Sequence, residues 1–507
     1  MKSDFYGLIE NEVGSSVTEN GAVGFKSSGH ALLDLNFAVS SLRSASDAEI
    51  VKRFEAAYRE DPLLAVLWLF FVRDCRHGQG ERRLFRVCMR WLSYENWALA
   101  SNLVHLIPEY GRWDDVADLF HSGVKMQAVD FYALQLRRDI GAAKADEGPI
   151  SLAAKWAPTL TAKDKERREQ AKDLRSWMGM TPREYRKMLS SLRGRLDVVE
   201  RKMSAGKWSQ IIYPAVPSRA NLTYKDAFLR HDEKRRRDYL SKVQSGEEKI
   251  NASVLFPHDI VHQYGKGCYD WYLPLQENTA LEELWRALPN TLPEGRSTIV
   301  VADGSGSMLS TVGNTGIRAL DVANALAIYF AERLPAPFKD KYITFSAHPQ
   351  LVDLSGCASL AHKINEAHRH DECSNTNVEA VFDLLLDTAV NNRLTQSQLP
   401  DNVLIISDME FDEGTFYSTA PVFRMIERRW KMWGYRLPRL VFWNVASRTG
   451  TIPVKENELG VALVSGFSPN VARLVMSDCL DPYEALLNEL NAERYETVKE
   501  AAMKCLP

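Results

Sequence analysis

The hydrophobic pattern of this 507-residue chain changes its period near residue 297, and this change constrains the fold more than any other feature. Before it, apolar residues recur at helical spacing in short segments. After it, short runs of β-branched residues alternate with helical segments, which is typical of a parallel sheet buried on both faces. The sequence therefore predicts an α-helical domain over 1–290, a doubly wound, Rossmann-like α/β domain over 296–481 and a C-terminal helix over 482–507.

The segments before residue 290 are short, apolar-periodic and separated by breakers such as Asp61-Pro62. Strand-like alternation is scarce there, so we expect stacked helix pairs of a HEAT-like kind, which could close into a ring. The stretch 204–221 holds two prolines and a glycine and predicts a loop. The predicted helices are 45–60, 62–73, 81–92, 97–107, 112–120, 127–140, 225–241 and 257–264.

Beyond residue 297 the same reading predicts six strands and four helices in alternation. The predicted strands are 298–302, 342–346, 350–354, 402–407, 440–445 and 461–465. The predicted helices are 318–334, 378–390, 422–433 and 469–477.

Composition excludes several classes of protein. Hydrophobic residues make up 45% and charged residues 25% of the chain, as in globular proteins, and no apolar run reaches the ~18–20 residues of a membrane-spanning helix. The seven cysteines are scattered without a Cys-x-x-Cys pair, which predicts reduced thiols. The N-terminus lacks the apolar core of a secretory signal, so we expect a cytoplasmic protein.

The net charge of −3 conceals an uneven distribution. Residues 161–250 contain 23 Lys/Arg and 13 Asp/Glu, so the remainder of the chain is strongly acidic. This basic segment could attract a polyanion while the rest of the chain repels it. The alternative is a set of solvated helix faces that carry mixed charge.

Polar residues stand at the ends of predicted strands, where open α/β sheets bind ligands. Asp303-Gly-Ser305-Gly-Ser307 follows the first strand, Thr376 precedes a helix, and Asp408 follows the strand 402–407. A hard cation such as Mg²⁺ prefers such oxygen ligands and keeps several waters. The pattern therefore predicts a divalent-cation site, for Mg²⁺ or else Mn²⁺ or Ca²⁺. The alternative is a strand-to-helix turn with an Asx cap and no metal.

Other kinds of site are poorly supported by the sequence. His368, His370 and Cys373 are residues of the types that bind zinc, but no second group of such residues accompanies them in the sequence. A polar loop is therefore expected there. The chain has no phosphate-binding Gly-x-x-x-x-Gly-Lys loop, no Gly-x-Ser-x-Gly elbow and no His-Glu-x-x-His helix. Glu410 and Asp412 add negative charge beside Asp408. We expect no catalytic activity.

The strand, the Asp303-x-Ser305-x-Ser307 motif, the Thr376 loop and the strand-terminal Asp408 occur in the order that resembles a von Willebrand factor A domain. The resemblance implies a metal-ion-dependent adhesion site. It makes Asp303, Ser305 and Ser307 direct ligands, Thr376 a conditional ligand, and Asp408 a ligand acting through water.

The combination of a helical first part with such a domain resembles the TROVE/Ro ribonucleoproteins, and more closely a related domain-of-unknown-function family. The resemblance spans most of the chain. It rests on Glu19-Asn-Gly-Ala, Phe71-Val-Arg-Asp-Cys-Arg-His-Gly-Gln-Gly-Glu-Arg-Arg, Tyr110-Gly-Arg-Trp-Asp-Asp, Glu184-Tyr-Arg-Lys, Val198–Trp208, Ala227-Phe-Leu-Arg-His-Asp, Lys249-Ile-Asn-Ala and Ile406-Ser-Asp-Met-Glu-Phe-Asp. It implies binding of structured RNA or single-stranded RNA ends, although the helical part departs from Ro in sequence.

Cations mixed with aromatic residues could supply phosphate contacts and base stacking. Pairing of Arg73 and Arg76 with Asp74 and Glu81, or burial of Trp208, is the competing interpretation. The candidate RNA contacts are Arg73, Arg76, Arg82, Arg83, Lys202, Lys207, Trp208, Arg219, Lys225, Arg235 and Arg236.

The first hypothesis is therefore a monomeric, non-catalytic, Ro-like RNA-binding protein whose cation site completes a ring or recruits a partner. The second is a protein scaffold whose metal site binds an acidic partner residue, without nucleic acid. An RNA-cleaving enzyme ranks third, because one cation with hydroxyl ligands lacks the paired metals or the general base that this chemistry usually uses.

Overall fold

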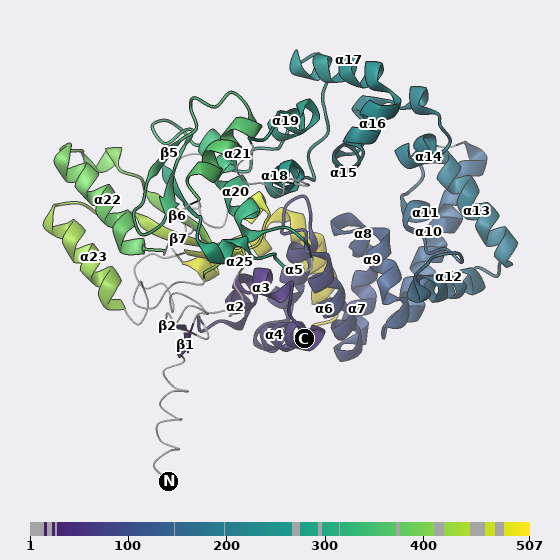
Figure 1. Cartoon of the computed structure of the whole chain (residues 1–507). Helices are drawn as coiled ribbons and strands as arrows, with labels where there is room; N and C mark the ends of the chain where they lie inside the picture. The colour runs from purple at the N-terminus through teal and green to yellow at the C-terminus, as the bar shows by residue number, and fades with distance from the viewer. Residues whose placement is uncertain are drawn as a thin grey trace, which may run out of the picture. The chain divides into compact units, whose positions relative to one another are not determined.

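The computed structural model of the chain forms two compact units (Figure 1). The sheet unit consists of residues 1–49 and 250–489, and the helical unit of residues 50–249 and 490–507. The structure describes residues 15–17, 23–25, 28–146, 148–196, 198–265, 274–292, 297–313, 315–371, 376–409, 420–446, 462–471 and 481–506.

The two units differ from the predicted domains 1–290, 296–481 and 482–507 because distant segments pack together. Helix α2 (Ala31–Phe37) brings Phe37 into the core beside the sheet, and the Ser40 hydroxyl donates to the carbonyl of Asn444 at 2.9 Å. Helix α18 (Pro257–Gly265) packs on the sheet unit's helix α20 (Ala319–Arg333). Each unit is therefore built from two separate stretches of chain.

The sheet has six strands in the order β5-β4-β3-β6-β7-β8, and β5 alone runs antiparallel to its neighbour. This is the 3-2-1-4-5-6 order of a doubly wound fold. Its strands are β3 (Thr298–Asp303), β4 (Lys341–Phe345), β5 (Leu351–Asp353), β6 (Asn402–Ser407), β7 (Arg439–Asn444) and β8 (Ala462–Ser465). The six predicted strands are thereby confirmed.

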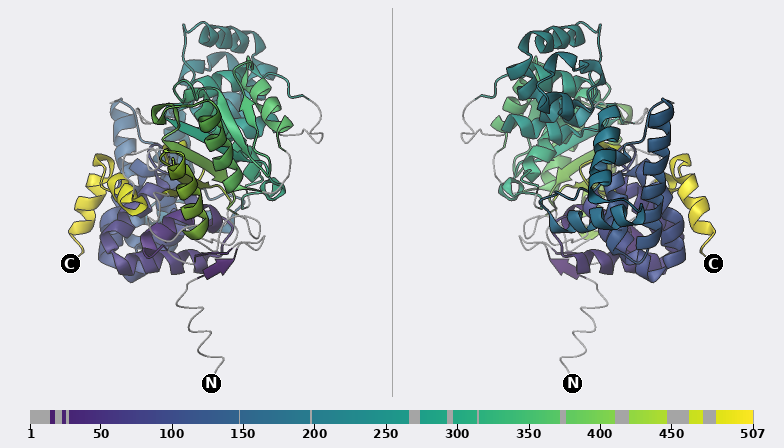
Figure 2. Two further views of the ribbon diagram at one scale, coloured as in Figure 1. Left: turned by 90° about the vertical axis from the view of Figure 1, so that its left-hand side faces the viewer. Right: turned by 90° about the vertical axis from the view of Figure 1, so that its right-hand side faces the viewer.

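Both faces of the sheet are covered, which explains why its strands read as continuous apolar runs. Ile299 and Val301 on one face share a core with α22 (Val378–Asn391) and with Trp430 of α23 (Ala420–Met432). On the other face Trp443 contacts Phe330 of α20, with ring centroids 5.4 Å apart. Figures 1 and 2 show α22 and α23 in lighter green beside the strands.

The remaining elements of the sheet unit include a small hairpin, β1 (Ser15–Val17) and β2 (Val23–Phe25), that the sequence did not predict. The predicted helix 469–477 begins as a 3₁₀ turn at Pro469–Val471, and its later part lies outside the described residues. The other helices of the unit are α3 (Val39–Leu42), α19 (Thr279–Arg286), α21 (Leu360–Arg369) and α25 (Pro482–Leu490).

The helical unit is a series of helices, as the sequence predicted. The bounds are α4 (Asp47–Glu60), α5 (Pro62–Arg73), α6 (Arg82–Glu95), α7 (Trp97–Leu103), α8 (Ile107–Tyr110), α9 (Trp113–Asp118), α10 (Lys125–Ala145), α11 (Ala153–Trp156), α12 (Lys165–Trp177), α13 (Pro182–Arg195), α14 (Val199–Ser204), α15 (Ser218–Thr223), α16 (Lys225–His231), α17 (Glu233–Gln244) and α26 (Glu496–Met503). Several neighbours along the chain pack together, among them α5 with α6 and α6 with α7. The predicted loop 204–221 contains two 3₁₀ turns and runs into α15.

Helix α5 is the centre of this unit. Asp61 caps its first turn by accepting from the amide of Leu64 at 2.9 Å, and Pro62 stands at the first helical position, where its missing N–H costs nothing. Its residues from Ala65 to Arg73 are all buried, and it packs against α6 and α26. A helix that is apolar all round needs neighbours on every side.

A buried carboxylate, Asp115 of α9, joins three helices of this unit. Its Oδ2 accepts from Arg73 Nε at 2.9 Å and Nη2 at 2.7 Å, and its Oδ1 accepts from Arg86 Nε at 2.7 Å. A Cβ at Gly111 would lie 2.6 Å from Asp115 Oδ2 and 3.0 Å from Arg73 Nε, so only glycine leaves room for this contact. Burial disfavours the charged form of Asp115, but Arg73 and Arg86 outweigh it and hold the pKa below its ordinary value.

Among the described residues, Cys75, Cys88, Cys357 and Cys505 form no disulfide bond. Within the described residues, no helix combines the length and the apolar character that crossing a bilayer requires.

Replacing Asp115 with Asn should lower the free energy of unfolding by about 3–5 kcal/mol near neutral pH, because two buried guanidinium groups lose their counter-charge. The lowered pKa means that this stabilisation is present above an ordinary Asp pKa of about 4 and is lost as the pH falls through the folded-state value. Urea unfolding of the wild type and the variant should therefore show a difference in unfolding free energy that becomes smaller below about pH 4. An equal difference at neutral and acid pH would contradict the ion pairing.

Candidate metal centre and basic helices

The carboxyl ends of β3 and β6 form the point where the sheet changes its winding direction, and this is where doubly wound folds bind ligands. The two strands are parallel neighbours with Ala302 opposite Ile406. Asp303 ends β3, and Asp408 directly follows β6. The fold therefore brings the first and the last of the five predicted metal ligands to one edge of the sheet.

Both carboxylate oxygens of Asp303 are held by hydrogen bonds. Oδ1 accepts from the Ser305 amide at 2.9 Å, and Oδ2 accepts from the Ser407 hydroxyl at 2.5 Å. Asp303 and Ser407 are buried. Two donors from two neighbouring segments thus fix the orientation of this carboxylate before any ligand binds.

The hydroxyls of Ser305 and Ser307 face each other beside Asp303, with 3.0 Å between their oxygens. Ser305 is extended and precedes the 3₁₀ turn Gly306–Leu309, which buries Met308. The Asx turn that the sequence left open as an alternative is present in the Ser305-to-Asp303 hydrogen bond. A cation site can be built on this same turn, because the turn leaves the hydroxyls of Ser305 and Ser307 facing each other.

Beyond β6, Met409 has a left-handed backbone with φ of 62° although its side chain is buried. A bulky residue in this region is strained, and such strain gathers at functional sites. The Met409 amide donates to the Ser407 hydroxyl at 3.0 Å, the same hydroxyl that binds Asp303. This turn therefore positions both Ser407 and the buried Asp408.

Thr376 stands directly before Asn377, the residue that caps α22 by accepting from the Ala380 amide at 3.0 Å. Thr376 is buried, and within the described residues its hydroxyl finds no hydrogen-bond partner. A buried hydroxyl of this kind costs free energy unless something binds it. The described structure contains no hydrogen bond from Thr376 to the other four predicted ligands.

The sequence missed Asp371 as a neighbour of this site. A Cβ at Gly304 would lie 3.2 Å from Asp371 Oδ1, so the carboxylate lies against the Asp303 loop, and Asn324 donates to its other oxygen at 3.3 Å. Burial first, and then the negative charges of Asp321 and Asp303, raise the pKa of Asp371 to about 7. Asp371 lies within the polar loop predicted at 368–373, and no spacing pattern connects it to Asp303.

Other acidic and zinc-type residues do not gather at this edge in the part of the chain that the structure describes. Glu410, Asp412 and Cys373 lie outside the described residues. His370 contacts Gln350 and Glu366, at 3.3 and 3.4 Å. The described residues include no group of three His, Cys, Asp or Glu side chains that could hold a metal.

Three of the predicted RNA contacts, Arg73, Lys225 and Arg236, are buried and must be removed from that set. Arg73 binds Asp115, a residue too far away in sequence to be recognised from local spacing. Arg236 has no exposed surface, and its guanidinium lies over the rings of Tyr213, Phe228 and Tyr239 at 5.0–5.3 Å. Neither guanidinium is available to a phosphate.

Trp208 and Arg235 also make their contacts within the protein. Trp208 stacks on His231 with ring centroids 4.5 Å apart. Arg235 donates to the carbonyls of Trp208 at 3.1 Å and Ile211 at 2.6 Å. Cations and aromatic rings alternate in this sequence because they fasten the loop 208–216 to α17.

The remaining candidates differ in exposure. Lys225 is buried and pairs with Asp226 at 3.0 Å, Lys202 is half-buried, and exposed Arg76 donates to the Glu109 carbonyl at 3.0 Å. Burial, followed by the charge of Arg112, lowers the pKa of Arg82 to about 10, although part of its side chain is exposed. The candidates with exposed side chains are Arg76, Arg82, Arg83, Lys207, Arg219 and Arg235.

Because Arg236 is buried without a carboxylate partner among the described residues, Arg236→Met should leave stability within about 1.5 kcal/mol of the wild type. Arg236→Glu should cost about 3 kcal/mol or more, since it buries a carboxylate among three aromatic rings. Chemical denaturation of both variants measures the difference. Wild-type stability of Arg236→Glu would show instead that this side chain reaches solvent.

The sequence was compared with family models, curated proteins and solved structures. A model described as Domain of unknown function (DUF7788) matches residues 297–505. The chain is 28% identical over 519 residues to Uncharacterized protein L728 of Acanthamoeba polyphaga mimivirus, covering 94% of this chain and 87% of that protein.

Among solved structures, the crystal structure of the Deinococcus radiodurans Ro (RSR) protein aligns over 90% of this chain and 93% of its own, at 14% sequence identity. The TM-score of 0.36 is too low to show a shared fold. A second family model, Domain of unknown function (DUF2828), matches residues 18–126 and 114–294, which together exceed half of the chain. The chain belongs to the DUF2828 family.

Proposed function

We propose that this protein is a monomeric, cytoplasmic, non-catalytic RNA-binding protein whose sheet unit holds a divalent cation. The single observation that carries the cation site is the preorganised Asp303 carboxylate beside two facing hydroxyls at the switch point of the sheet. The proposal includes the von Willebrand factor A character of the sheet unit and the HEAT-like character of the helical unit. It follows the resemblance to the Ro ribonucleoproteins.

Asp303, Ser305 and Ser307 would bind the cation directly, with Thr376 as a further hydroxyl ligand and Asp408 acting through water. The donors are all oxygens, as Mg²⁺ prefers, and the buried hydroxyl of Thr376 needs a partner. Ser407 would orient Asp303 without touching the cation. Such a cation supplies an open coordination position that can accept a carboxylate of a partner.

Isothermal titration with Mg²⁺ or Mn²⁺ tests the site. The Asp303→Ala variant should lose measurable binding, because it removes the one carboxylate proposed as a direct ligand. The Ser407→Ala variant should bind about 10–100-fold more weakly, since outer-sphere partners of metal ligands have effects of this size.

Thr388→Ala is the matched control, because it removes an exposed hydroxyl of α22 that bonds only within its own helix among the described residues. Unchanged cation affinity in Asp303→Ala would exclude the proposed ligand set. Mg²⁺-dependent RNA cleavage that disappears in Asp303→Ala would overturn the non-catalytic assignment.

RNA binding is supported by the excess of positive charge in residues 161–250 and by exposed cations of the helical unit. Arg82 and Arg83 begin α6 beside the Gly78-Gln-Gly80 loop, and Lys207 and Arg219 are exposed before and after the loop 208–216 in the sequence. These side chains can contact phosphates without disturbing the core. The buried Arg73 and Arg236 are not among the proposed RNA contacts.

Reversing Arg82, Arg83, Lys207 and Arg219 to Glu should weaken binding of a single-stranded RNA and reduce its dependence on salt. Each lost phosphate contact lowers the slope of log K against log salt by about 0.7, so the slope should fall by up to about 3. Fluorescence anisotropy over a range of salt concentrations measures both quantities.

The matched control reverses four exposed cations of the sheet unit, Lys339, Arg369, Arg428 and Arg436. An equal loss of RNA binding in both variants would indicate unspecific attraction and contradict the placement in the helical unit. A wild-type protein that binds neither structured nor single-stranded RNA would exclude the RNA-binding function.

A protein scaffold is the second candidate, and one observation favours it. Arg73, Arg86 and Arg236 are used inside the helical unit, so the surface is less basic than the sequence suggests. In that case the open coordination position would bind an acidic residue of a partner protein. Complexes that depend on Mg²⁺ but resist nuclease would distinguish this function from RNA binding.

A further inference from the structure

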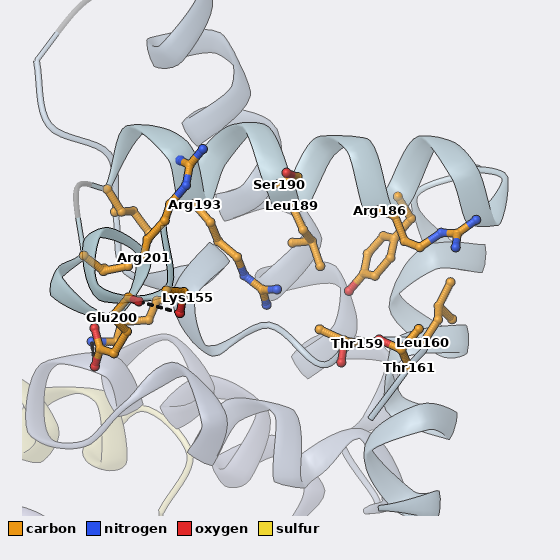
Figure 3. A pocket seen from close by; sticks show the side chains of 14 residues that line it. Lys155, Thr159, Leu160, Thr161, Arg186, Leu189, Ser190, Arg193, Glu200 and Arg201 are labelled. Carbon is orange, nitrogen blue, oxygen red and sulfur yellow. Dashed lines mark hydrogen bonds and ion pairs between the residues drawn. The ribbon is translucent and has the colours of Figure 1, made fainter. Parts of the chain in front are cut away.

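The helical unit contains a pocket of about 590 Å³ that the sequence did not predict (Figure 3). Helix α13 forms one wall, the segment 155–161 forms the facing wall, and α14 closes one end. The volume lies within the usual range of small-molecule sites, about 300–1,000 Å³.

The wall at residues 153–158 is built before any ligand binds, because side chains hold its carbonyl groups. Arg193 donates from Nε to the Ala154 carbonyl at 2.8 Å and from Nη2 to the Ala157 carbonyl at 3.0 Å. The Tyr185 hydroxyl donates to the Pro158 carbonyl at 2.9 Å. Arg193 and Tyr185 both come from α13, so this helix fixes the width of the pocket.

The lining carries more positive than negative charge. Among the described residues its cations are Lys155, Arg186, Arg193 and Arg201 and its one acid is Glu200, which is 3.8 Å from Lys155. No carboxylate among the described residues pairs with Arg186, Arg193 or Arg201. Burial lowers the pKa of Arg193, which means that its charge is poorly solvated and that a bound anion would stabilise it.

A second part of the lining is apolar. Leu160, Leu189, Leu196 and Val198 line the pocket together with the ring of Tyr185. Thr159 and Ser190 add hydroxyl groups to the lining (Figure 3). A ligand that fills the pocket must therefore combine an anionic group with a flat or apolar group.

We infer that this pocket binds a mononucleotide, either free or as the phosphorylated end of an RNA strand. The arginine forks match the oxygens of a phosphate monoester, and the apolar side chains can pack against a base. The free nucleotide does not depend on the proposed RNA-binding function, whereas the RNA end rests on it.

The position of Arg201 depends on Gly194 of α13. A Cβ added at Gly194 would collide with Arg201 Nη1, so glycine lets the guanidinium lie against the helix. The Gly194→Ala variant would displace Arg201 while keeping every charge. Alanine also favours helix by up to about 1 kcal/mol over glycine, so this variant should fold.

The test uses the full chain and four probes: AMP, inorganic phosphate, and one ten-nucleotide RNA with either a 5′-phosphate or a 5′-hydroxyl. The Arg186→Gln/Arg201→Gln variant should bind AMP at least about tenfold more weakly, because each charge-assisted contact contributes about that factor. Gly194→Ala should show a smaller loss. The control, Arg183→Gln/Lys187→Gln, removes two exposed cations of the same helix that do not line the pocket and should leave AMP affinity unchanged.

Several outcomes decide between the possibilities. AMP binding that fails in the wild type, or that falls equally in the control, overturns the inference. Inorganic phosphate that binds as tightly as AMP overturns the nucleotide assignment, because the apolar wall then contributes nothing. AMP binding without RNA binding supports the pocket and excludes the RNA-binding function.

If the RNA affinity is the same with and without the 5′-phosphate and is unchanged in Arg186→Gln/Arg201→Gln, the RNA end is excluded as the ligand. The surface cations then remain as the RNA site. Preference for the 5′-phosphate that disappears in Arg186→Gln/Arg201→Gln supports the inference for RNA ends.

Discussion

A buried carboxylate must be neutralised, and this requirement organises the helical unit around Asp115. Its two oxygens bind Arg73 from α5 and Arg86 from α6, so three helices meet at one charged group. Asp303 in the sheet unit has hydrogen-bond partners of a different kind. Its oxygens accept hydrogen bonds from one amide and one hydroxyl, both of which are neutral donors. The first carboxylate is neutralised by two guanidinium groups, and the second is the carboxylate to which we assign the proposed cation.

The sheet could be predicted from the sequence because burial on both faces leaves a local signal. Each strand is a short apolar run, and the polar residues that follow β3 and β6 mark the ligand-binding edge directly. Ser407 could have been predicted in the same way, since the parallel register places it beside Asp303. Asp371 was not, because its approach to Gly304 depends on how a loop folds back.

The basic residues were the least predictable part. Local spacing suggested that Arg73 would pair with Asp74 or Glu81, yet its partner comes from another helix. In the run Lys234–Arg237 one cation of four, Arg236, points inward, because a helix turns about 100° per residue. The pocket beside α13 left no sequence signal, since its lining comes from the segments 155–161, 185–193 and 196–204, whose approach only the fold defines.

The path of the chain through the two units has a consequence for biosynthesis. Residues 50–249 interrupt the sheet unit, and α26, at the C-terminal end, packs against α5 and α7 of the helical unit. Arg494, just before α26, bonds the buried carboxylate of Asp74 at 2.9 Å. The helical unit therefore stays incomplete until residues 490–507 have been synthesised, and a fragment cut near residue 290 would leave both units unfinished.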